Sequence, residues 1–240
     1  MLEVDLHVHS LFSQCGLHTI LELLERARSQ GMKGIAITDH GLTVGGRLNS
    51  VFFERFVSPY PEVQVFKGVE CNLLDAEGNI DFPVKFRKFI DIALLGIHPN
   101  TVKGGDARLY TDMLIKAIDR NPHIDIITHP NDPNYPIDFD NLARFAAERD
   151  VVIEINNSKI RYARSTVEEV KKLLAACVKY SCPVAVNSDT HAIHELGDDT
   201  SIRPVLEDVE FPEELIVNQT AERALSFIRK CRAGKSFGSS

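Results

Sequence analysis

The sequence lacks any apolar run long enough to cross a membrane, and it lacks the features of a signal peptide. A membrane-spanning helix needs about 20 mainly apolar residues, and the apolar runs here are far shorter. A signal peptide places basic residues before an apolar stretch, whereas Met1-Leu2-Glu3 leads directly into a strand-like run. We therefore expect a soluble, cytoplasmic protein that has no membrane partner.

Cysteine is scarce, and positive charge is in deficit. The five cysteines are an odd number without paired spacing, which favours reduced thiols in the cytosol over a disulfide framework. The chain has 27 Lys and Arg against 34 Asp and Glu, a net charge of −7. Proteins that bind long nucleic acids are normally basic, so we expect no such partner. A small anionic substrate remains compatible with this balance, because bound metal ions set the local charge.

The sequence is rich in short runs of Val, Ile and Leu that end in a histidine or a carboxylate. At 240 residues and 44% hydrophobic content, the chain is large enough for one core, and we expect a single domain over residues 1–240. The first run carries His7 and His9, which share a face because strand side chains alternate. Later runs end at His40, Glu70, His98, His129, Asp189 and His191.

Helical segments separate these runs. Capping-box spacing from Thr19 to Glu22, and again from Ser165 to Glu168, predicts two helix starts, and an apolar stripe that includes Leu109 predicts another helix. Near-continuous apolar strands are typical of a parallel sheet buried on both faces. We predict an α/β fold, a closed or nearly closed (β/α) barrel with its site at the carboxyl ends of the strands. A doubly wound open sheet is the alternative, although its site lies at one switch point and explains ligands from so many strands less well.

The conformation of three connecting segments can also be predicted. The turn composition of residues 75–79 predicts a small hairpin over residues 73–80. The irregular segment from Leu42 to Pro61 is long enough to fold over the site as a lid. Proline follows both His98 and His129, which favours extended backbone at each histidine.

The strand-end motifs resemble those of the PHP (polymerase and histidinol phosphatase) family over essentially the whole chain, most closely its small stand-alone branch of YcdX-like phosphatases. The motifs are Asp5-Leu6-His7-Val8-His9-Ser10, Thr38-Asp39-His40-Gly41, Gly68-Val69-Glu70, His98, Thr128-His129-Pro130, Glu154-Ile155-Asn156-Asn157-Ser158 and Asn187-Ser188-Asp189-Thr190-His191. The resemblance implies a distorted, TIM-barrel-like (β/α)7 barrel, a site for three metal ions, and hydrolysis of phosphate esters.

The resemblance also implies a ligand set. One metal ion is held by His7, His9, Glu70 and Asp189, and Glu70 bridges to a second ion held by His98 and His129. A third ion uses His40, His191 and one residue of the loop after the first strand, where the closest relatives have a histidine at the position of Cys15. We favour His18 for this role, because a neutral imidazole suits Mn, Fe or Zn, whereas a thiolate biases the site toward Zn.

From this set we expect two to three divalent metal ions (Zn, Mn or Fe) and a small phosphorylated substrate. Clustered metals lower the pKa of bound water and neutralise phosphate oxygens, so we expect a metal-bound hydroxide to attack a phosphate monoester without a covalent enzyme intermediate. Glu70, His98, Asp189 and His191 are the predicted catalytic residues.

Other polar residues have two open interpretations each. Arg47, Lys159, Arg161 and Arg164 lie in predicted loops at the active face and either bind phosphate or are solvated charges. Asn156 faces the site or forms a turn, and Asp5 and Asp39 either orient ligand histidines or cap turns. His123 precedes a strand and is expected at the opposite end of the barrel, and His194 is expected to be exposed.

Three other functions compete with the phosphatase. One is a phosphodiesterase or exonuclease acting on short nucleotides. Another is a metal-binding regulatory module without turnover, which the full set of predicted ligands disfavours. A metal-dependent deaminase or amidohydrolase also uses His-x-His and a late Asp, but Glu70 and the later histidines fit it less well.

Overall fold

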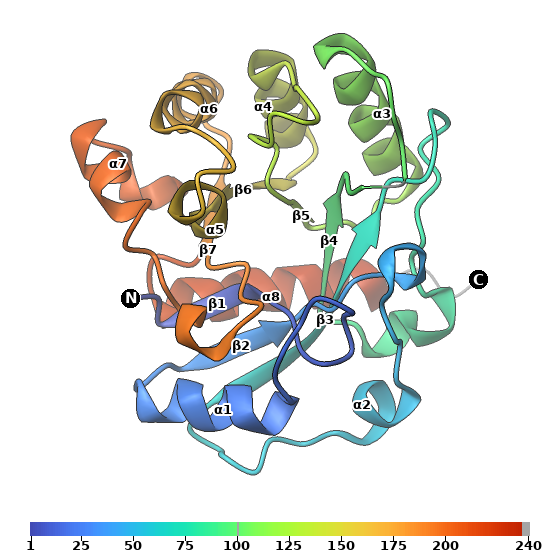
Figure 1. The fold of residues 1–240 in the computed structure, drawn as a ribbon, viewed down its shortest axis with the longest axis vertical. Coiled ribbons are helices and arrows are strands. Elements are labelled where there is room, and N and C mark those ends of the chain that lie inside the picture. Colours follow the sequence, from blue (N-terminus) through green and yellow to red (C-terminus); the bar gives the residue numbers. More distant parts are fainter. Residues whose placement is uncertain (100, 237–240) are drawn as a thin grey trace.

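The computed structural model describes residues 1–99 and 101–236, and these contain a sheet of seven parallel strands (Figure 1). Each strand pairs with the next one along the chain. The strands are β1 (Val4–Val8), β2 (Gly34–Ile37), β3 (Gln64–Asn72), β4 (Ile92–Gly96), β5 (Ile126–Ile127), β6 (Val152–Asn156) and β7 (Val184–Asn187).

The first and last strands meet, so the sheet is a nearly closed barrel. Val8 and Thr190 form a parallel bridge, and the N–H of His9 donates to the carbonyl of Thr190 at 2.9 Å. The strand order runs from β1 to β7 without the reversal that defines a doubly wound sheet. The predicted (β/α)7 barrel is confirmed, and the open-sheet alternative is wrong.

Helices pack around the outside of the strands. Figure 1 shows α1 (Ile20–Ser29) and α2 (Ser50–Arg55) along one side, and α3 (Ala107–Arg120), α4 (Phe139–Glu148) and α6 (Val167–Lys179) along the opposite side. The shorter α5 (Asn157–Arg161) and α7 (Arg203–Asp208) follow β6 and β7. None of the helices in the described residues is both long and apolar enough to span a bilayer.

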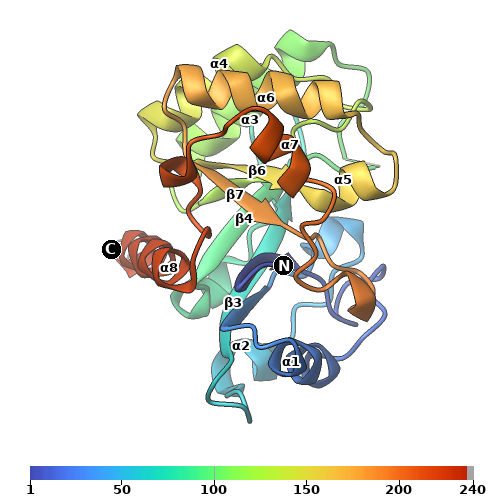
Figure 2. The same ribbon diagram turned by 90° about the vertical axis from the view of Figure 1, so that its left-hand side faces the viewer.

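The last helix, α8 (Ala221–Ser236), closes the amino-terminal end of the barrel. Its Ala224 and Ile228 belong to one cluster with the inward-facing strand residues Val4, Leu6, Ala36, Phe66, Ile92, Leu94, Ile126, Val152 and Ala185. In Figure 1, α8 runs behind the strands, and in Figure 2 it lies on the side away from α5 and the chain's N-terminus. The barrel interior is therefore filled, and the carboxyl ends of the strands remain for the site.

The helix starts were predicted with different success. At α1, Thr19 Oγ1 accepts from the N–H of Glu22 at 3.2 Å, and Glu22 accepts in return from the N–H of Thr19 at 2.7 Å, so the predicted capping box is confirmed. At α6 the cap is Thr166, whose side chain accepts from the N–H of Glu169. The prediction of Ser165 as the cap is wrong, because its hydroxyl instead hydrogen-bonds Asn131.

Two other local predictions need correction or refinement. Leu109 is 41% exposed, so the apolar stripe of α3 does not include it. The segment from Leu42 to Pro61, which the sequence describes as an irregular connection long enough to form a lid, contains the helix α2. Phe52 and Phe53 of this helix are buried in the core. The hairpin over residues 73–80 is confirmed by an antiparallel bridge between Leu73 and Ile80.

Candidate metal centre

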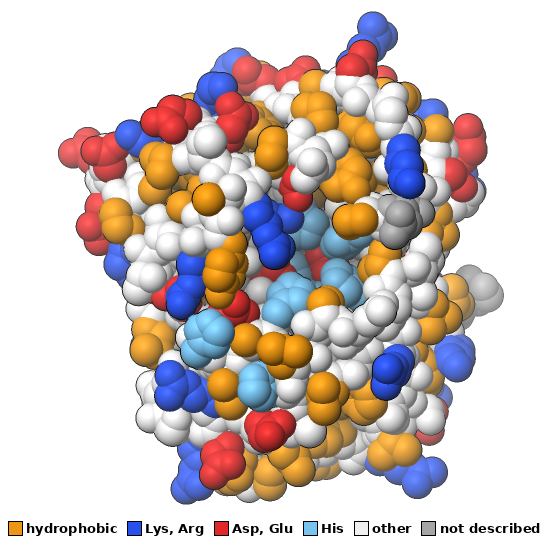
Figure 3. Space-filling view, in the orientation of Figure 1, with side chains coloured by type: hydrophobic (Ala, Val, Ile, Leu, Met, Phe, Trp, Pro, Cys, Tyr) orange, Lys and Arg blue, Asp and Glu red, His pale blue; other side chains and the backbone are white. Residues whose placement is uncertain are grey.

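The carboxyl ends of the strands bring together nearly all of the predicted ligands. Figure 3 shows histidine side chains around a hollow on this face, with acidic side chains between them. Of the nine predicted ligands, all but His18 belong to this cluster, and they are His7, His9, His40, Glu70, His98, His129, Asp189 and His191. These residues lie at or just beyond the ends of β1, β2, β3, β4, β5 and β7.

Glu70, on β3, is the centre of the cluster. Its carboxylate is buried, and Oε1 lies 3.1 Å from Nε2 of both His98 and His129. Its other oxygen, Oε2, lies 2.9 Å from Nδ1 of His40 and 3.3 Å from Nε2 of His7. The two oxygens therefore face two different groups of histidines.

His7 and His9 face each other through nitrogens that both carry lone pairs when the two rings are neutral. Nδ1 of His7 lies 2.7 Å from the Glu154 carboxylate, which can only accept, so this nitrogen carries the proton. Nδ1 of His9 lies 3.0 Å from Oγ of Ser13, whose own hydrogen goes to Asp39 Oδ1 at 2.6 Å. These partners assign both tautomers, and they leave the two Nε2 lone pairs 3.0 Å apart.

This geometry fits a divalent cation. Two lone pairs at 3.0 Å repel each other unless a proton or a metal ion lies between them. Nδ1 of His40 and Oε2 of Glu70 are also buried without a hydrogen-bond partner, although they lie 2.9 Å apart. Buried polar atoms are normally satisfied, and imidazole nitrogens and carboxylates are common metal ligands. The residues present therefore fit a site for divalent metal ions.

Metal binding needs neutral imidazoles and ionised carboxylates, and Glu70 and His9 have these states without a metal ion. Burial lowers the pKa of His7, but Glu154, Glu70 and Asp189 outweigh it and raise this pKa well above its usual value, so a metal ion at His7 would displace a proton. Burial raises the pKa of Glu70, but the nearby His98, His7 and His40 outweigh it and hold the pKa well below the usual value. Burial, together with His40 and His191, lowers the pKa of His9 well below its usual value. At neutral pH, Glu70 is therefore ionised and His9 is neutral.

Two residues for which the sequence predicts no role hold the ligands in place. Glu154, at the end of β6, accepts from Nδ1 of His7 and, at 2.9 Å, from the backbone N–H of His129. Ser13 lies between Nδ1 of His9 and Asp39. Such partners fix the orientation of a ligand histidine. The carboxylate of Glu154 in a buried strand was the available signal, whereas nothing in the sequence distinguishes Ser13.

Asp39 and Asp5 have different roles. Asp39 accepts from the hydroxyl of Ser13 and so supports His9 through one intermediate residue. Asp5 accepts from the N–H groups of His7, Ser188 and Gly197 and from the hydroxyl of Ser188, so it holds the segment after β7 against the backbone of β1.

The backbone at His129 differs from the prediction. Its φ of 34° lies in the left-handed region, although the following proline favours extended backbone. Its N–H donates to Glu154 and its Nε2 lies 3.1 Å from Glu70, and these contacts hold the residue in place. Asp189 is also left-handed, with φ 55°. Strained backbone of this kind clusters at functional sites.

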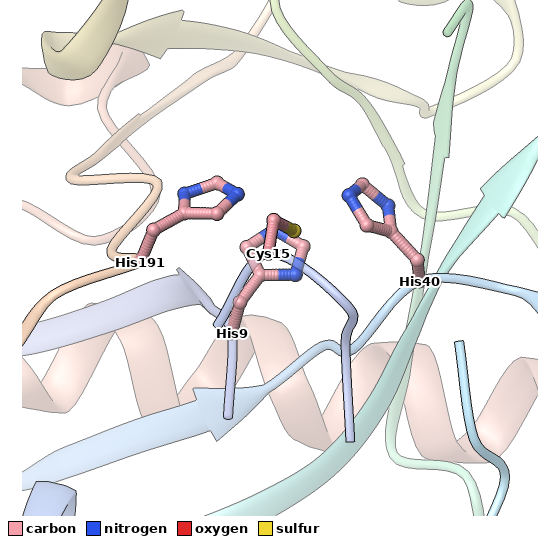
Figure 4. A group of neighbouring side chains, drawn as sticks. All are labelled: His9, Cys15, His40 and His191. Carbon is pink, nitrogen blue, oxygen red and sulfur yellow. The ribbon is translucent and has the colours of Figure 1, made fainter. Parts of the chain in front are cut away.

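The loop after β1 places Cys15, rather than the expected His18, in the cluster. One potential ligand atom from each of His9, Cys15, His40 and His191 lies within 4.8 Å of the others, and the four side chains point toward one another (Figure 4). His18 belongs to none of the ligand groups found among the described residues, and its carbonyl accepts from the N–H of Leu11. In the described residues the path of the loop therefore brings Cys15, and not His18, beside His9, His40 and His191.

Comparison with known proteins places the chain in a family. A model of the PHP domain matches residues 5–158. A protein of Caldicellulosiruptor saccharolyticus named "Probable phosphatase" is 35% identical over 231 residues, which are 95% of this chain and 96% of that protein. The chain belongs to the PHP domain family. With the donor set described above, this PHP domain is that of a metal-dependent hydrolase.

Solved structures share the fold of this PHP domain at low sequence identity. A chain of an archaeal ribonuclease P complex with mature tRNA superposes with a TM-score of 0.62 and 16% identity, covering 99% of this chain and 94% of that chain. Histidinol phosphate phosphatase from Lactococcus lactis, complexed with zinc, L-histidinol and phosphate, gives a TM-score of 0.58 and 14% identity, covering 95% and 93%. At these identities the likeness shows the fold alone.

The four basic residues expected at the active face of the PHP domain differ in their surroundings. Lys159 is buried, with Nζ 2.6 Å from Oδ2 of Asp132, and the N–H of Asp132 donates to the carbonyl of His129. Arg161 forms an ion pair with Asp198. Arg47 and Arg164 are exposed. Lys159 is therefore the basic residue tied most directly to the metal centre.

The remaining predicted polar residues are placed as follows. Asn156 has both of its proposed roles, because Nδ2 donates to Asp189 at 3.1 Å while Oδ1 caps α5. His123 lines a pocket with Phe227 of α8, at the end of the barrel opposite the site, and the side chain of His194 is 62% exposed.

Proposed function

We propose that this protein is a phosphatase that hydrolyses a small phosphate monoester at a centre of two to three divalent metal ions. The single observation that carries the proposal is the position of Glu70, whose two oxygens face separate groups of histidines. A carboxylate shared in this way suits neighbouring metal ions. The name of the Caldicellulosiruptor relative and the phosphate-bearing Lactococcus structure support the phosphate-ester chemistry.

The chain's own residues would hold the ions in distinct groups. His7, His9 and Asp189 form one group, with Asp189 Oδ1 3.4 Å from Nε2 of His9. His98 and His129 form a second group on the other oxygen of Glu70. When bound, divalent ions supply an activated water and neutralise the oxygens of a phosphate.

Lys159 is the proposed phosphate-binding residue. Its ammonium group is buried beside Asp132, so it is held in a fixed position rather than moving freely in solvent. A phosphate that binds near His129 would meet this charge, and charge-assisted hydrogen bonds to phosphate are among the stronger ones. The backbone contact between Asp132 and His129 links this pair to the metal centre.

A small substrate fits the surface better than a polymer. The chain carries a net charge of −7, and long nucleic acids bind through many phosphate contacts that need a basic surface. The substrate is therefore proposed to be a small molecule that carries one terminal phosphate group, which is transferred to water.

The proposal is tested with p-nitrophenyl phosphate and bis-p-nitrophenyl phosphate on Mn²⁺-loaded, Zn²⁺-loaded and chelator-treated protein. We expect hydrolysis of the monoester in preference to the diester, and loss of activity with the chelator. Glu70→Gln should abolish turnover in a folded protein, whereas Glu62→Gln, at an exposed ion pair with Arg28, should not. Preference for the diester would support the phosphodiesterase, and full activity of Glu70→Gln would overturn the proposed centre.

A further inference from the structure

We propose that Cys15 is a metal ligand, and that Cys15, His40 and His191 form a sulfur-containing position which selects a thiophilic ion such as Zn²⁺. This inference rests on the proposed metal-dependent function and adds to it a difference between the metal positions. The ligand atoms of the three residues belong to a group that lies within 4.8 Å of one another (Figure 4).

The loop that carries Cys15 is fixed on both sides of the residue. Before it, the N–H of Ser13 donates to the carbonyl of Ser10 at 2.9 Å. After it, a Cβ at Gly16 would lie 2.0 Å from that same carbonyl oxygen, so only glycine fits. The N–H of Leu17 then donates to the carbonyl of His191 at 3.0 Å. The thiol is therefore positioned by the backbone and tied to another member of the group.

His9 belongs to the neighbouring group of ligands, together with His7 and Asp189. A neutral imidazole has one lone pair, and that of His9 is on Nε2, which lies 3.0 Å from Nε2 of His7 and 3.4 Å from Asp189. Its Nδ1 faces Ser13. His9 therefore completes the first group, and Cys15 is left with His40 and His191.

The two remaining histidines have nitrogens free for an ion. Nδ1 of His191 lies 2.9 Å from the carbonyl of Asp189, which accepts its proton and leaves the lone pair on Nε2. Nδ1 of His40, a residue only 9% exposed, is buried without a hydrogen-bond partner. This nitrogen lies 2.9 Å from Oε2 of Glu70, so it points to an ion between His40 and Glu70, next to the group that contains Cys15.

The donor atoms differ between the metal positions. The groups around Glu70 and Asp189 offer only nitrogen and oxygen, which suit Mn and Fe as well as Zn, whereas a thiolate favours softer ions such as Zn. Two nitrogens and one sulfur also leave the fourth place of a tetrahedral site open, as in catalytic zinc sites. The predicted result is a centre that holds different metals at different positions.

The first test measures protection of the Cys15 thiol. Cys15 is exposed, while Cys71, Cys177, Cys182 and Cys231 are buried and serve as internal controls. Alkylation by iodoacetamide is followed at each cysteine by mass spectrometry, with and without Zn²⁺ at about 100 times its Kd. Because only the metal-free fraction reacts, we expect alkylation of Cys15 to slow about 100-fold. An unchanged rate in protein that has bound Zn²⁺ would overturn the proposal.

The second test uses Cd²⁺ as the probe and needs no turnover. The native chain should show near-ultraviolet thiolate-to-metal absorption, which Cys15→Ser should abolish together with one tightly bound ion. Cys15→His should restore the ion without the absorption, and His18→Ala should behave like the native chain. Absorption that persists in Cys15→Ser, or loss of the ion in His18→Ala alone, would refute the assignment.

Failure of this inference is distinguishable from failure of the proposed function. Hydrolysis of the monoester by a protein without thiolate absorption would reject the Cys15 ligand and keep the phosphatase. Thiolate absorption in a protein that hydrolyses neither ester would keep the ligand and reject the phosphatase.

Discussion

Glu154 offers a test of the metal centre that leaves every proposed ligand in place. Its Oε1 accepts from Nδ1 of His7 at 2.7 Å and from Nδ2 of Asn187 at 2.9 Å. Its Oε2 accepts from the N–H of His129 and from Nδ2 of Asn156, both at 2.9 Å. Glu154→Gln keeps the shape of the side chain but replaces one acceptor oxygen with an NH₂ group, which then faces two donors.

The expected losses of stability and of metal affinity in Glu154→Gln follow from these contacts. A hydrogen bond to a charged group contributes about 1.5–3 kcal/mol, so the disruption of two of them lowers the free energy of unfolding by about 3–6 kcal/mol. The His7 tautomer is no longer fixed, and removal of such a partner typically weakens metal binding by about 10–100-fold, or about 1.4–2.7 kcal/mol.

The assay is a competition of the protein with a chromophoric chelator for Zn²⁺, with thermal unfolding measured in parallel. Glu62→Gln is the matched control, because it makes the same change at an exposed position. If Glu154→Gln is folded and binds Zn²⁺ as tightly as the control, Glu154 does not orient His7 for metal binding, and the assignment of the tautomer fails.

Three further predictions follow from the surrounding contacts. Ser13→Ala removes the partner of Nδ1 of His9 and should weaken Zn²⁺ binding about tenfold in the same competition assay. An unchanged affinity for Zn²⁺ would show that Ser13 does not orient His9 for metal binding. Lys159→Met should raise the KM for p-nitrophenyl phosphate about tenfold, equivalent to one charge-assisted hydrogen bond of about 1.4 kcal/mol, and an unaltered KM would assign Lys159 a structural role. Burial raises the pKa of Asp132, but Lys159 outweighs it and holds the pKa below its usual value. The ion pair between Asp132 and Lys159 therefore stabilises the fold fully above the ordinary Asp pKa of about 4, and this stabilisation is lost as the pH falls through the lower folded-state pKa of Asp132. The difference in Tm between the native protein and Asp132→Asn should narrow over that pH range. A difference in Tm that stays constant would contradict the ion pair.

Much of the fold and many of the candidate ligands followed from local patterns. Short apolar runs alternating with amphipathic helices predict parallel strands whose carboxyl ends meet at one face. The alternation of strand side chains placed His7 and His9 together, and their Nε2 atoms lie 3.0 Å apart. These predictions succeeded because period and order along the chain are properties of the sequence itself.

Loop residues were harder to predict, because contacts distant in sequence decide their course. The hydrogen bond from Leu17 to His191 directs the loop after β1, so Cys15 reaches the cluster and His18 does not. Similarly, Glu154 and Glu70 hold His129 in a left-handed conformation that the following proline disfavours.

The sequence by itself determined the barrel, the end of the barrel that carries the site, and the types of ligand gathered there. Only the tertiary structure decided which nitrogen each histidine presents, which loop residue joins the cluster, and which side chains hold the ligands in place. The physical reason is that strand and helix patterns depend on near neighbours, whereas a tautomer or a loop path depends on partners such as Glu154, which lies 147 positions from His7 and 2.7 Å from its ring.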